Sequence, residues 1–196
     1  MTMKVGSLCT GFGGIEIGLR LAGLDFTTPW YAEVEPALVP LLATDHPGVP
    51  NLGDVTAVDW ALVEPVDLIV GGIPCQPTSA AGKRLGDADP RWLWPATREC
   101  LTVLRPRQFL LENVRGLVSH DKGRLFDGIC ADLVGLGYDV RWLTLGACSV
   151  GLAHHRHRVF LLATPSTTPT ARRRDVAPCG TPKSVSRPTP RAQPYG

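Results

Sequence analysis

The stretch Asp67-Leu68-Ile69-Val70-Gly71-Gly72-Ile73-Pro74-Cys75-Gln76-Pro77 sets the architecture of this chain. It begins with a short apolar run, partly β-branched and bounded by glycines, which predicts a buried strand over 67–71. A cysteine then follows the carboxyl end of that strand, in a tight loop bounded by prolines. Open α/β sheets bind their ligands at this end of their strands. Cys75 is therefore a candidate nucleophile, although most free cysteines are simply small buried hydrophobic residues.

Strands and helices alternate along the rest of the chain. This alternation, with nearly continuous apolar strands, predicts an α/β fold whose mostly parallel sheet carries helices on both faces. No clear crossover helix separates the last two strands, so we expect the last strand to be antiparallel. Strands are expected over 4–8, 29–33, 51–55, 67–71, 107–112, 138–145 and 158–163, and helices over 13–22, 36–44, 92–104 and 123–136.

Length and composition are those of a single globular domain. The chain has 196 residues, of which 44% are hydrophobic, enough for an ordinary core. We place the domain at 1–164. Residues 165–196 are rich in Pro, Thr, Arg and Ser, and they cannot bury enough apolar area to offset their ordering entropy. We therefore expect a disordered tail there.

The sequence favours a cytoplasmic protein. No apolar run is long enough to span a membrane, and no signal peptide is recognisable. The six cysteines lack the paired C-x-x-C spacing of zinc sites, and reduced thiols fit the cytosol. A net charge of +2 does not by itself indicate a nucleic-acid binder. The basic tail either contacts phosphates or stays solvated, and the second is the simpler reading.

The first predicted strand leads into a glycine-rich turn, Cys9-Thr10-Gly11-Phe12-Gly13-Gly14. Glycines at a strand-to-helix turn let the backbone approach a ligand closely. Glu33, at the end of the next strand, is placed to accept hydrogen bonds from ribose hydroxyls. Asp54, at the end of the third, is placed to accept from an adenine amine. The pattern indicates an adenosine-containing cofactor without separating a dinucleotide from S-adenosylmethionine, and a plain glycine turn with solvated acids is the alternative.

Two further groups of polar residues follow strands. Glu112 ends the fifth strand, where a partly desolvated carboxylate suits proton sharing with a substrate nitrogen. It equally fits an acid favoured by the dipole at a helix start. The run His154-His155-Arg156-His157-Arg158 precedes the last strand. Its compact spacing, without nearby cysteine or carboxylate, argues against a metal, so no metal is expected, and the two guanidiniums are favoured as donors to carbonyl oxygens or phosphates.

Taken together, these motifs resemble those of the cytosine-5 DNA methyltransferases. The matching motifs, in the family's order, are Thr10-Gly11-Phe12-Gly13-Gly14, Glu33, Asp54, Pro74-Cys75-Gln76, Glu112-Asn113-Val114 and Arg156-x-Arg158. The resemblance covers nearly all of the expected domain. It implies a Rossmann-like enzyme that transfers a methyl group from S-adenosylmethionine to C5 of cytosine in DNA.

The resemblance also implies roles for individual residues. Cys75 would attack C6 of a cytosine extruded from the duplex. Glu112 would bind N3 and the exocyclic amine, Arg158 would hold the O2 carbonyl, and Arg156 would support the loop or a phosphate. The residues expected to hold S-adenosylmethionine are Cys9, Thr10, Gly11, Phe12, Gly13, Gly14, Glu33, Val34, Asp54, Val55 and Pro74.

Several positions depart from the family's pattern. Ser7 stands where Asp is usual, Cys9 where Phe is usual, and Val34 where an aromatic residue is frequent. His154 and His155 replace the Gln-Arg start of the late motif. The family also continues with a target-recognition domain and a final motif, so the resemblance is to the catalytic lobe alone.

These departures leave alternatives open. The chain is expected to be a truncated or split methyltransferase, with a second chain as the source of target recognition. The alternative is a catalytically degenerate subunit that binds or regulates. An NAD-dependent oxidoreductase ranks lower, because it gives no use to the Pro-Cys-Gln and Glu-Asn-Val motifs. The family's RNA-modifying branch stays open, and the sequence does not identify the DNA site.

Overall fold

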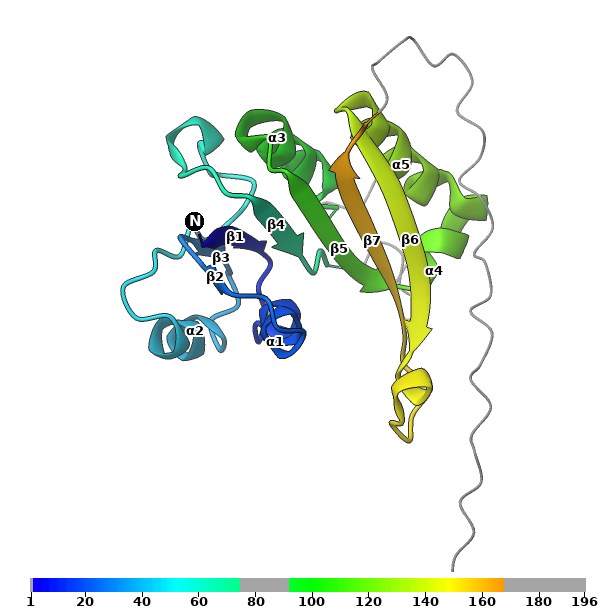
Figure 1. The fold of residues 1–196 in the computed structure, drawn as a ribbon, viewed down its shortest axis with the longest axis horizontal. Coiled ribbons are helices and arrows are strands. Elements are labelled where there is room, and N and C mark those ends of the chain that lie inside the picture. The colour runs from blue at the N-terminus through cyan, green and yellow to red at the C-terminus, as the bar shows by residue number, and fades with distance from the viewer. Residues whose placement is uncertain (1, 75–91, 168–196) are drawn as a thin grey trace, which may run out of the picture.

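The computed structural model describes residues 2–74 and 92–167, which form one seven-stranded sheet with helices around it (Figure 1). The strand order is β2-β1-β4-β5-β7-β6, and β3 also pairs with β1. The strands are β1 (Met3–Leu8), β2 (Phe26–Thr27), β3 (Tyr31–Ala32), β4 (Leu68–Gly71), β5 (Gln108–Val114), β6 (Tyr138–Gly146) and β7 (His157–Pro165). All pairings are parallel except those of β7, which runs antiparallel to both β5 and β6. The predicted fold class, including the antiparallel last strand, is confirmed.

Helices pack on both faces of the sheet because the central strands are apolar on both sides. The α-helices are α1 (Gly14–Leu21), α2 (Val39–Asp45), α3 (Trp94–Leu104), α4 (Gly116–Ser119) and α5 (Arg124–Gly135). On one face, α3, α4 and α5 cover the larger core, which includes Ile69 and Phe109. On the other face, α1 covers Val5, Val70 and their neighbours. In the part of the chain that the structure describes, no helix is long and apolar enough to cross a membrane.

The sheet ends beside β1 in two short strands. Met3 pairs with Phe26 and Ser7 with Tyr31, so the register shifts by one residue between β2 and β3. The predicted strand over 29–33 is therefore confirmed only at 31–32. Pro29 lies in the interruption, which suits a residue without an N–H to donate to the sheet.

The structure corrects two other sequence predictions and adds two short helices. The segment 51–55 is not a strand, because only Asn51 makes an isolated bridge, to Tyr31. Helix α2 begins at Val39 rather than at 36, because the N–H groups of Leu38 and Val39 both bond to the carbonyl of Glu35 in a turn. Helix α4 and the short 3₁₀ helix η3 (His120–Gly123) were not predicted.

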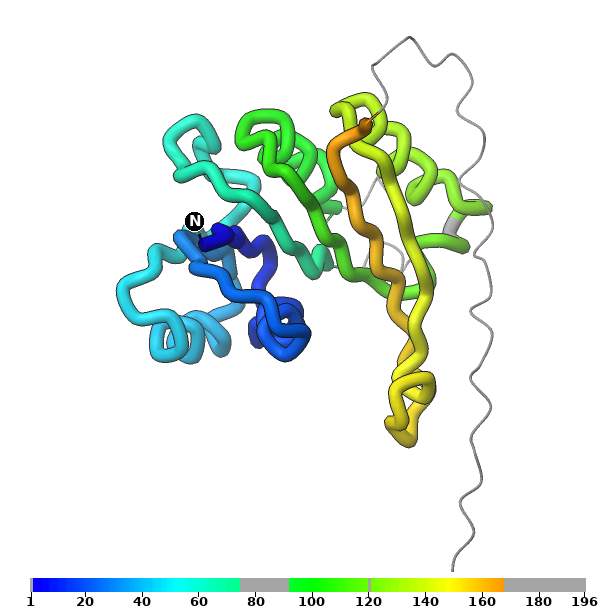
Figure 2. The backbone as a smooth tube through the Cα atoms, in the orientation of Figure 1, coloured from blue at the N-terminus to red at the C-terminus, as the bar shows by residue number. Residues whose placement is uncertain are grey.

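Strands β6 and β7 form a long hairpin whose tip projects beyond the rest of the described chain (Figure 2). The tip contains the 3₁₀ helix η4 (Ala147–Val150). On β6, Leu143 and Leu145 are exposed on the face of the sheet that α1 covers farther along. β7 ends at Pro165, one residue beyond the predicted domain end at 164, and most of the predicted tail (168–196) lies outside the described residues.

Trp30 packs directly over the backbone of β1. A Cβ at Gly6 would lie 2.2 Å from Cζ2 of Trp30. The indole Nε1 donates to the carbonyl of Glu64 at 2.9 Å, and the ring centroid lies 5.8 Å from that of Trp60. Glycine at position 6 therefore makes room for the aromatic contacts that hold this edge of the sheet.

Replacing Gly6 by Ala should lower the free energy of unfolding by at least about 2 kcal/mol, because the new methyl group overlaps the Trp30 ring. Guanidinium unfolding followed by tryptophan fluorescence measures the change. Gly128→Ala is the matched control, because Gly128 is exposed on α5 with open space around it; it should raise stability by up to about 1 kcal/mol. Equal stabilities of the two variants would contradict the packing described here.

Candidate active site

The functional candidates gather at one edge of the sheet. The parallel strands β1, β3, β4 and β5 all end there, and the antiparallel β7 begins there. Loops at this edge are where open α/β sheets bind ligands. The topology therefore brings together residues that are far apart in the sequence.

Glu112 and Arg158 form an ion pair across β5 and β7. The Arg158 Nε lies 2.7 Å from Glu112 Oε1, and the side chains of Arg158 and Glu112 are only 23% and 25% exposed. Glu112 pairs with Phe160 and Val114 with Arg158, so the two charged residues lie diagonally on the same face of the sheet. The structure thus joins two of the predicted catalytic residues, while their roles remain predictions.

Asn113 fixes the backbone that leads to the predicted nucleophile. Its buried side-chain amide donates from Nδ2 to the carbonyl of Ile73 at 3.1 Å, and its Oδ1 accepts from the N–H of Val114 at 2.8 Å. Asn113 belongs to the Glu112-Asn113-Val114 motif, but the sequence alone did not indicate a role for its side chain. Pro74 is the last described residue before Cys75, and Cys75 itself lies outside the described residues.

Glu33 holds together two loops at the other end of this edge. Its Oε2 accepts from the N–H of Gly11 at 2.7 Å, and its Oε1 accepts from the N–H groups of Val34 and Glu35. The Asn51 side chain in turn binds the backbone of Glu33. Its Oδ1 accepts from the N–H of Glu33, and its Nδ2 donates to the carbonyl of Glu33. A carboxylate has about four lone-pair sites, so Glu33 keeps room for a ligand hydroxyl while it shapes the glycine turn.

The predicted cofactor residues around this turn differ in exposure. Phe12 and Val34 are 71% and 63% exposed, and they adjoin Gly11 and Glu33, which are hydrogen-bonded to each other. Gly11 and Gly13 have positive φ values of 60° and 68°, which side chains rarely adopt. Thr10 is buried, and its N–H bonds to the carbonyl of Ala32. The turn and the adjoining Val34 therefore present backbone and the apolar side chains of Phe12 and Val34 to solvent.

Asp54 begins a turn rather than ending a strand. Its Oδ1 accepts from both the N–H and the hydroxyl of Thr56, and these hydrogen bonds lower the pKa of the Asp54 carboxyl. The side chain is exposed, and Oδ2 has no hydrogen-bond partner within the described residues. Val55, next to it, is buried in the larger core. The acid therefore remains ionised and available to accept a hydrogen bond.

Cys9 lies near the carboxylates of Glu33 and Asp54 and has an unusual backbone conformation. Its φ is 51°, although it is not a glycine. Burial raises the pKa of its thiol to about 12, and the nearby Glu33 and Asp54 carboxylates add to the shift. This thiol therefore stays protonated near neutral pH and acts as a small apolar surface.

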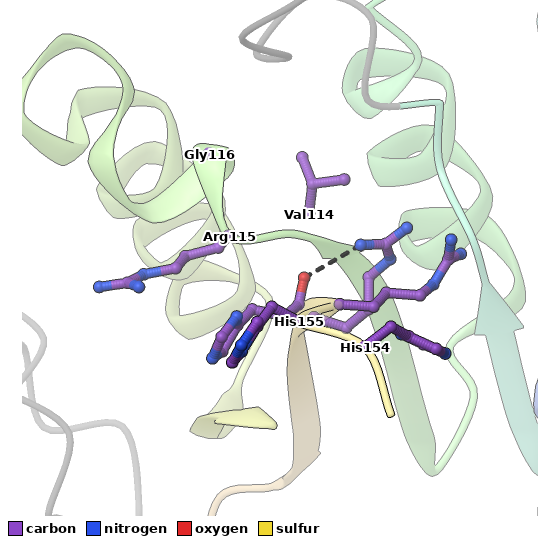
Figure 3. Close-up of a pocket in the computed structure, with 8 residues that line it drawn as sticks. Val114, Arg115, Gly116, His154 and His155 are labelled. Carbon is purple, nitrogen blue, oxygen red and sulfur yellow. Dashed lines mark hydrogen bonds between the residues drawn. The ribbon is translucent and has the colours of Figure 1, made fainter. Parts of the chain in front are cut away.

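A basic hollow lies next to the Glu112–Arg158 pair, and Arg158 is one of the residues that line it. It has a volume of about 630 Å³ and is lined by Val114, Arg115, Gly116, His154, His155, Arg156, His157 and Arg158. Figure 3 shows that these side chains come from the end of β5 with the turn into α4, and from the segment that leads into β7. Arg156 and Arg158 were predicted site residues, whereas Arg115 was missed. Among the described residues, no group of three His, Cys, Asp or Glu side chains is arranged to hold a metal.

Comparisons with known proteins agree with this geometry. A family model described as C-5 cytosine-specific DNA methylase matches residues 3–186. The type II methyltransferase M.NlaX of Neisseria lactamica is 36% identical, over 81% of this chain and 51% of its own length. M.AquIA of Picosynechococcus sp., also a type II methyltransferase, is 34% identical, over 83% of this chain and 72% of its own length.

Solved structures share the fold. The Entamoeba histolytica methyltransferase EhMeth aligns with a TM-score of 0.68 and 14% identity, over 85% of this chain and 54% of that chain. Among the relatives, the chain spans about half the length of M.NlaX and 42% of M.NlaIV. The similarity therefore concerns one part of longer proteins.

The pKa of Cys9 yields a prediction about its reactivity. With a pKa near 12 it has almost no thiolate at pH 8, so iodoacetamide should leave it unmodified, because the thiolate is the reactive form. The exposed Cys148 should be alkylated under the same conditions. Peptide mass mapping after a timed reaction resolves the two sites. Alkylation of Cys9 as fast as that of Cys148 would show that the turn is not packed as described.

Proposed function

The chain belongs to the C-5 cytosine-specific DNA methylase family, and on that premise we propose a specific activity for it. It carries the catalytic part of a DNA (cytosine-5)-methyltransferase, which transfers a methyl group from S-adenosylmethionine to C5 of cytosine. The observation that carries this proposal is the Glu112–Arg158 pair at the ligand-binding edge of the sheet, beside the segment that leads into Cys75.

The geometry around Glu112 supports a role in binding the base. Its Oε1 is taken by Arg158, whereas Oε2 lies toward the end of β4: a Cβ at Gly72 would be 3.9 Å from it. Asn113 holds the carbonyl of Ile73, two residues before Cys75. A cytosine at this edge would thus meet Oε2 of Glu112 on the side of Gly72, with the Arg158 guanidinium next to it.

The proposed chemistry follows from these positions. The Cys75 thiolate forms a bond to C6 of an extruded cytosine, while Glu112 engages N3 and the exocyclic amine and Arg158 engages O2. The addition moves electron density to C5, which then takes the methyl group. A water or buffer base takes the C5 proton, and elimination of the Cys75 thiolate restores the aromatic ring. Covalent addition divides one difficult substitution at an unreactive carbon into easier steps.

The residues present at the glycine turn fit S-adenosylmethionine, which would supply an electrophilic methyl group. Oδ2 of Asp54, which has no hydrogen-bond partner among the described residues, and the remaining lone pairs of Glu33 suit an adenine amine and ribose hydroxyls. Exposed Phe12 and Val34 offer apolar contact to a flat ring. The Cys9 thiol, kept neutral by burial, adds no charge to this surface. Of the other residues predicted to hold the cofactor, Pro74 is half-buried, whereas Val55 is buried in the larger core.

We also propose that the active form contains further polypeptide, from the rest of a longer protein or from a second chain that supplies target recognition. The relatives differ in length. This chain covers 72% of M.AquIA but only 51% of M.NlaX, so M.AquIA is the shorter of the two. Ile17 and Leu21 of α1 and Leu143 and Leu145 of β6 are exposed. Exposed apolar side chains on a helix and on the sheet face that it partly covers are typical of surfaces that another part of an assembly covers.

Covalent trapping tests the proposed function. The protein, with labelled S-adenosylmethionine and DNA containing 5-fluorocytosine, should give a covalent complex, because fluorine replaces the C5 proton that must leave. Parallel reactions contain any polypeptide encoded beside this chain that could supply target recognition. Cys75→Ser should give no complex, and Glu112→Gln should form it about 100-fold more slowly or worse.

Cys148→Ser is the matched control, because Cys148 is exposed on the hairpin tip and should not affect trapping. A complex that forms equally with Cys75→Ser would refute the assigned nucleophile. Wild-type protein that binds S-adenosylmethionine but gives no complex with any partner would instead favour a degenerate binding or regulatory subunit.

A further inference from the structure

A buried acid without a partner lies beside the glycine turn. Glu16, in the first turn of α1, is only 5% exposed, and its buried Oε1 has no hydrogen-bond partner in the described structure. Buried carboxylates are normally hydrogen-bonded, because taking an unpaired charge out of water is costly. Arg20 follows one helical turn later, but its guanidinium carbon lies over Phe26, 4.2 Å from the centre of that ring. The burial of Glu16 therefore needs another explanation.

The usual structural role of a glutamate at this position is not realised. Gly13 is the N-cap residue of α1, so Glu16 occupies the third helical position, from which a glutamate can accept the N–H of the N-cap residue. Here the N–H of Gly13 donates instead to the carbonyl of Thr10 at 3.0 Å. An interaction with the helix dipole remains, but an exposed acid would obtain it without the cost of burial.

The Glu16 carboxylate borders the open space over the turn. Apart from adjacent residues, a Cβ built at Gly11 or Gly14 would have no described atom within 4 Å, whereas a Cβ at Gly13 would lie 4.0 Å from Oε2 of Glu16. Glu33 bonds to the N–H of Gly11 at 2.7 Å, so two carboxylates flank the same turn. Open space beside this negative charge suits a ligand with a cationic end.

We propose that Glu16 binds the α-ammonium group of S-adenosylmethionine and so determines specificity for the amino-acid end of the cofactor. The proposal rests on the proposed function and deepens it, because Glu33 and Asp54 concern only the adenosine end. An ammonium group has a positive charge and three N–H donors, so it forms charge-assisted hydrogen bonds with a carboxylate. The ligand thereby supplies the partner that Glu16 lacks within the chain.

Isothermal titration calorimetry with two ligands that differ only in the α-amino group tests the proposal. S-adenosylhomocysteine carries the ammonium, and its desamino analogue keeps the carboxylate but lacks the ammonium. Wild-type protein should bind S-adenosylhomocysteine roughly 10-fold or more tightly than the analogue, because the analogue leaves the buried acid unpaired. Glu16→Gln should bind S-adenosylhomocysteine about 10-fold more weakly than wild type, and the analogue no more weakly than wild type does.

Thermal unfolding without ligand separates this role from a purely structural one. Glu16→Gln keeps the size of the side chain and removes a charge that has no partner, so its unfolding midpoint should equal or exceed that of wild type. The rise in midpoint that S-adenosylhomocysteine causes should be smaller for the variant.

Glu99→Gln is the matched control, because Glu99 is exposed on α3, which covers the other face of the sheet. The same chemical change there should leave the affinities for both ligands unchanged.

The outcomes separate this proposal from the proposed function. Glu16→Gln that binds S-adenosylhomocysteine as tightly as wild type, or that loses equal affinity for both ligands, would overturn the ammonium contact alone. A lower midpoint of ligand-free Glu16→Gln would also overturn it, because the carboxylate would then be stabilising the chain itself. Wild-type protein that binds neither ligand would overturn the contact even if covalent trapping succeeds. Failure of trapping as well would overturn the proposed function together with it.

Discussion

The Glu112–Arg158 ion pair is the interaction on which the candidate site depends. It exists because β7 runs antiparallel to β5, so that the beginning of one strand meets the end of the other. A parallel β7 would place Arg158 at the opposite edge of the sheet. The hairpin of β6 and β7 is thus a structural requirement of the site, since it returns the chain to the edge where the parallel strands end. Two partly buried charges held in this way cost desolvation, which their mutual contact offsets.

Two polar side chains, Asn113 and Glu33, organise the backbone at either end of the same edge. Asn113 is buried and ties β5 to the segment after β4, which leads into Pro74. Glu33 satisfies the N–H groups of Gly11, Val34 and Glu35, which would otherwise need water or a ligand. Buried polar groups are costly unless bonded, so both residues stabilise one arrangement of the loops. The surfaces proposed to bind the base and the cofactor are therefore shaped by hydrogen bonds within the chain.

The sequence predicted the central strands and helices well, because their patterns were strong. The two short apolar runs that form β4 and β5 have the length and composition that are typical of buried strands. Prediction failed over 51–55, where Asn51 acts through its side chain and makes only one bridge, so no periodic pattern distinguishes it. Arg115 was missed because a lone arginine after a strand carries no signal until the fold brings the 154–158 segment beside it. The roles of Asn51 and Asn113 likewise depend on partners far away in the sequence, and Cys75 lies outside the described residues.

A double-mutant cycle on Glu112 and Arg158 tests the central claim most directly. The free energies of unfolding of wild type, Glu112→Gln, Arg158→Gln and the double variant are measured by urea denaturation at low salt. Because the pair is only partly exposed, the account predicts a coupling free energy of about 1 kcal/mol, which weakens as salt is added. Additive effects, within about 0.3 kcal/mol, would mean that the two side chains do not meet across β5 and β7, and the proposed base site would lose its foundation.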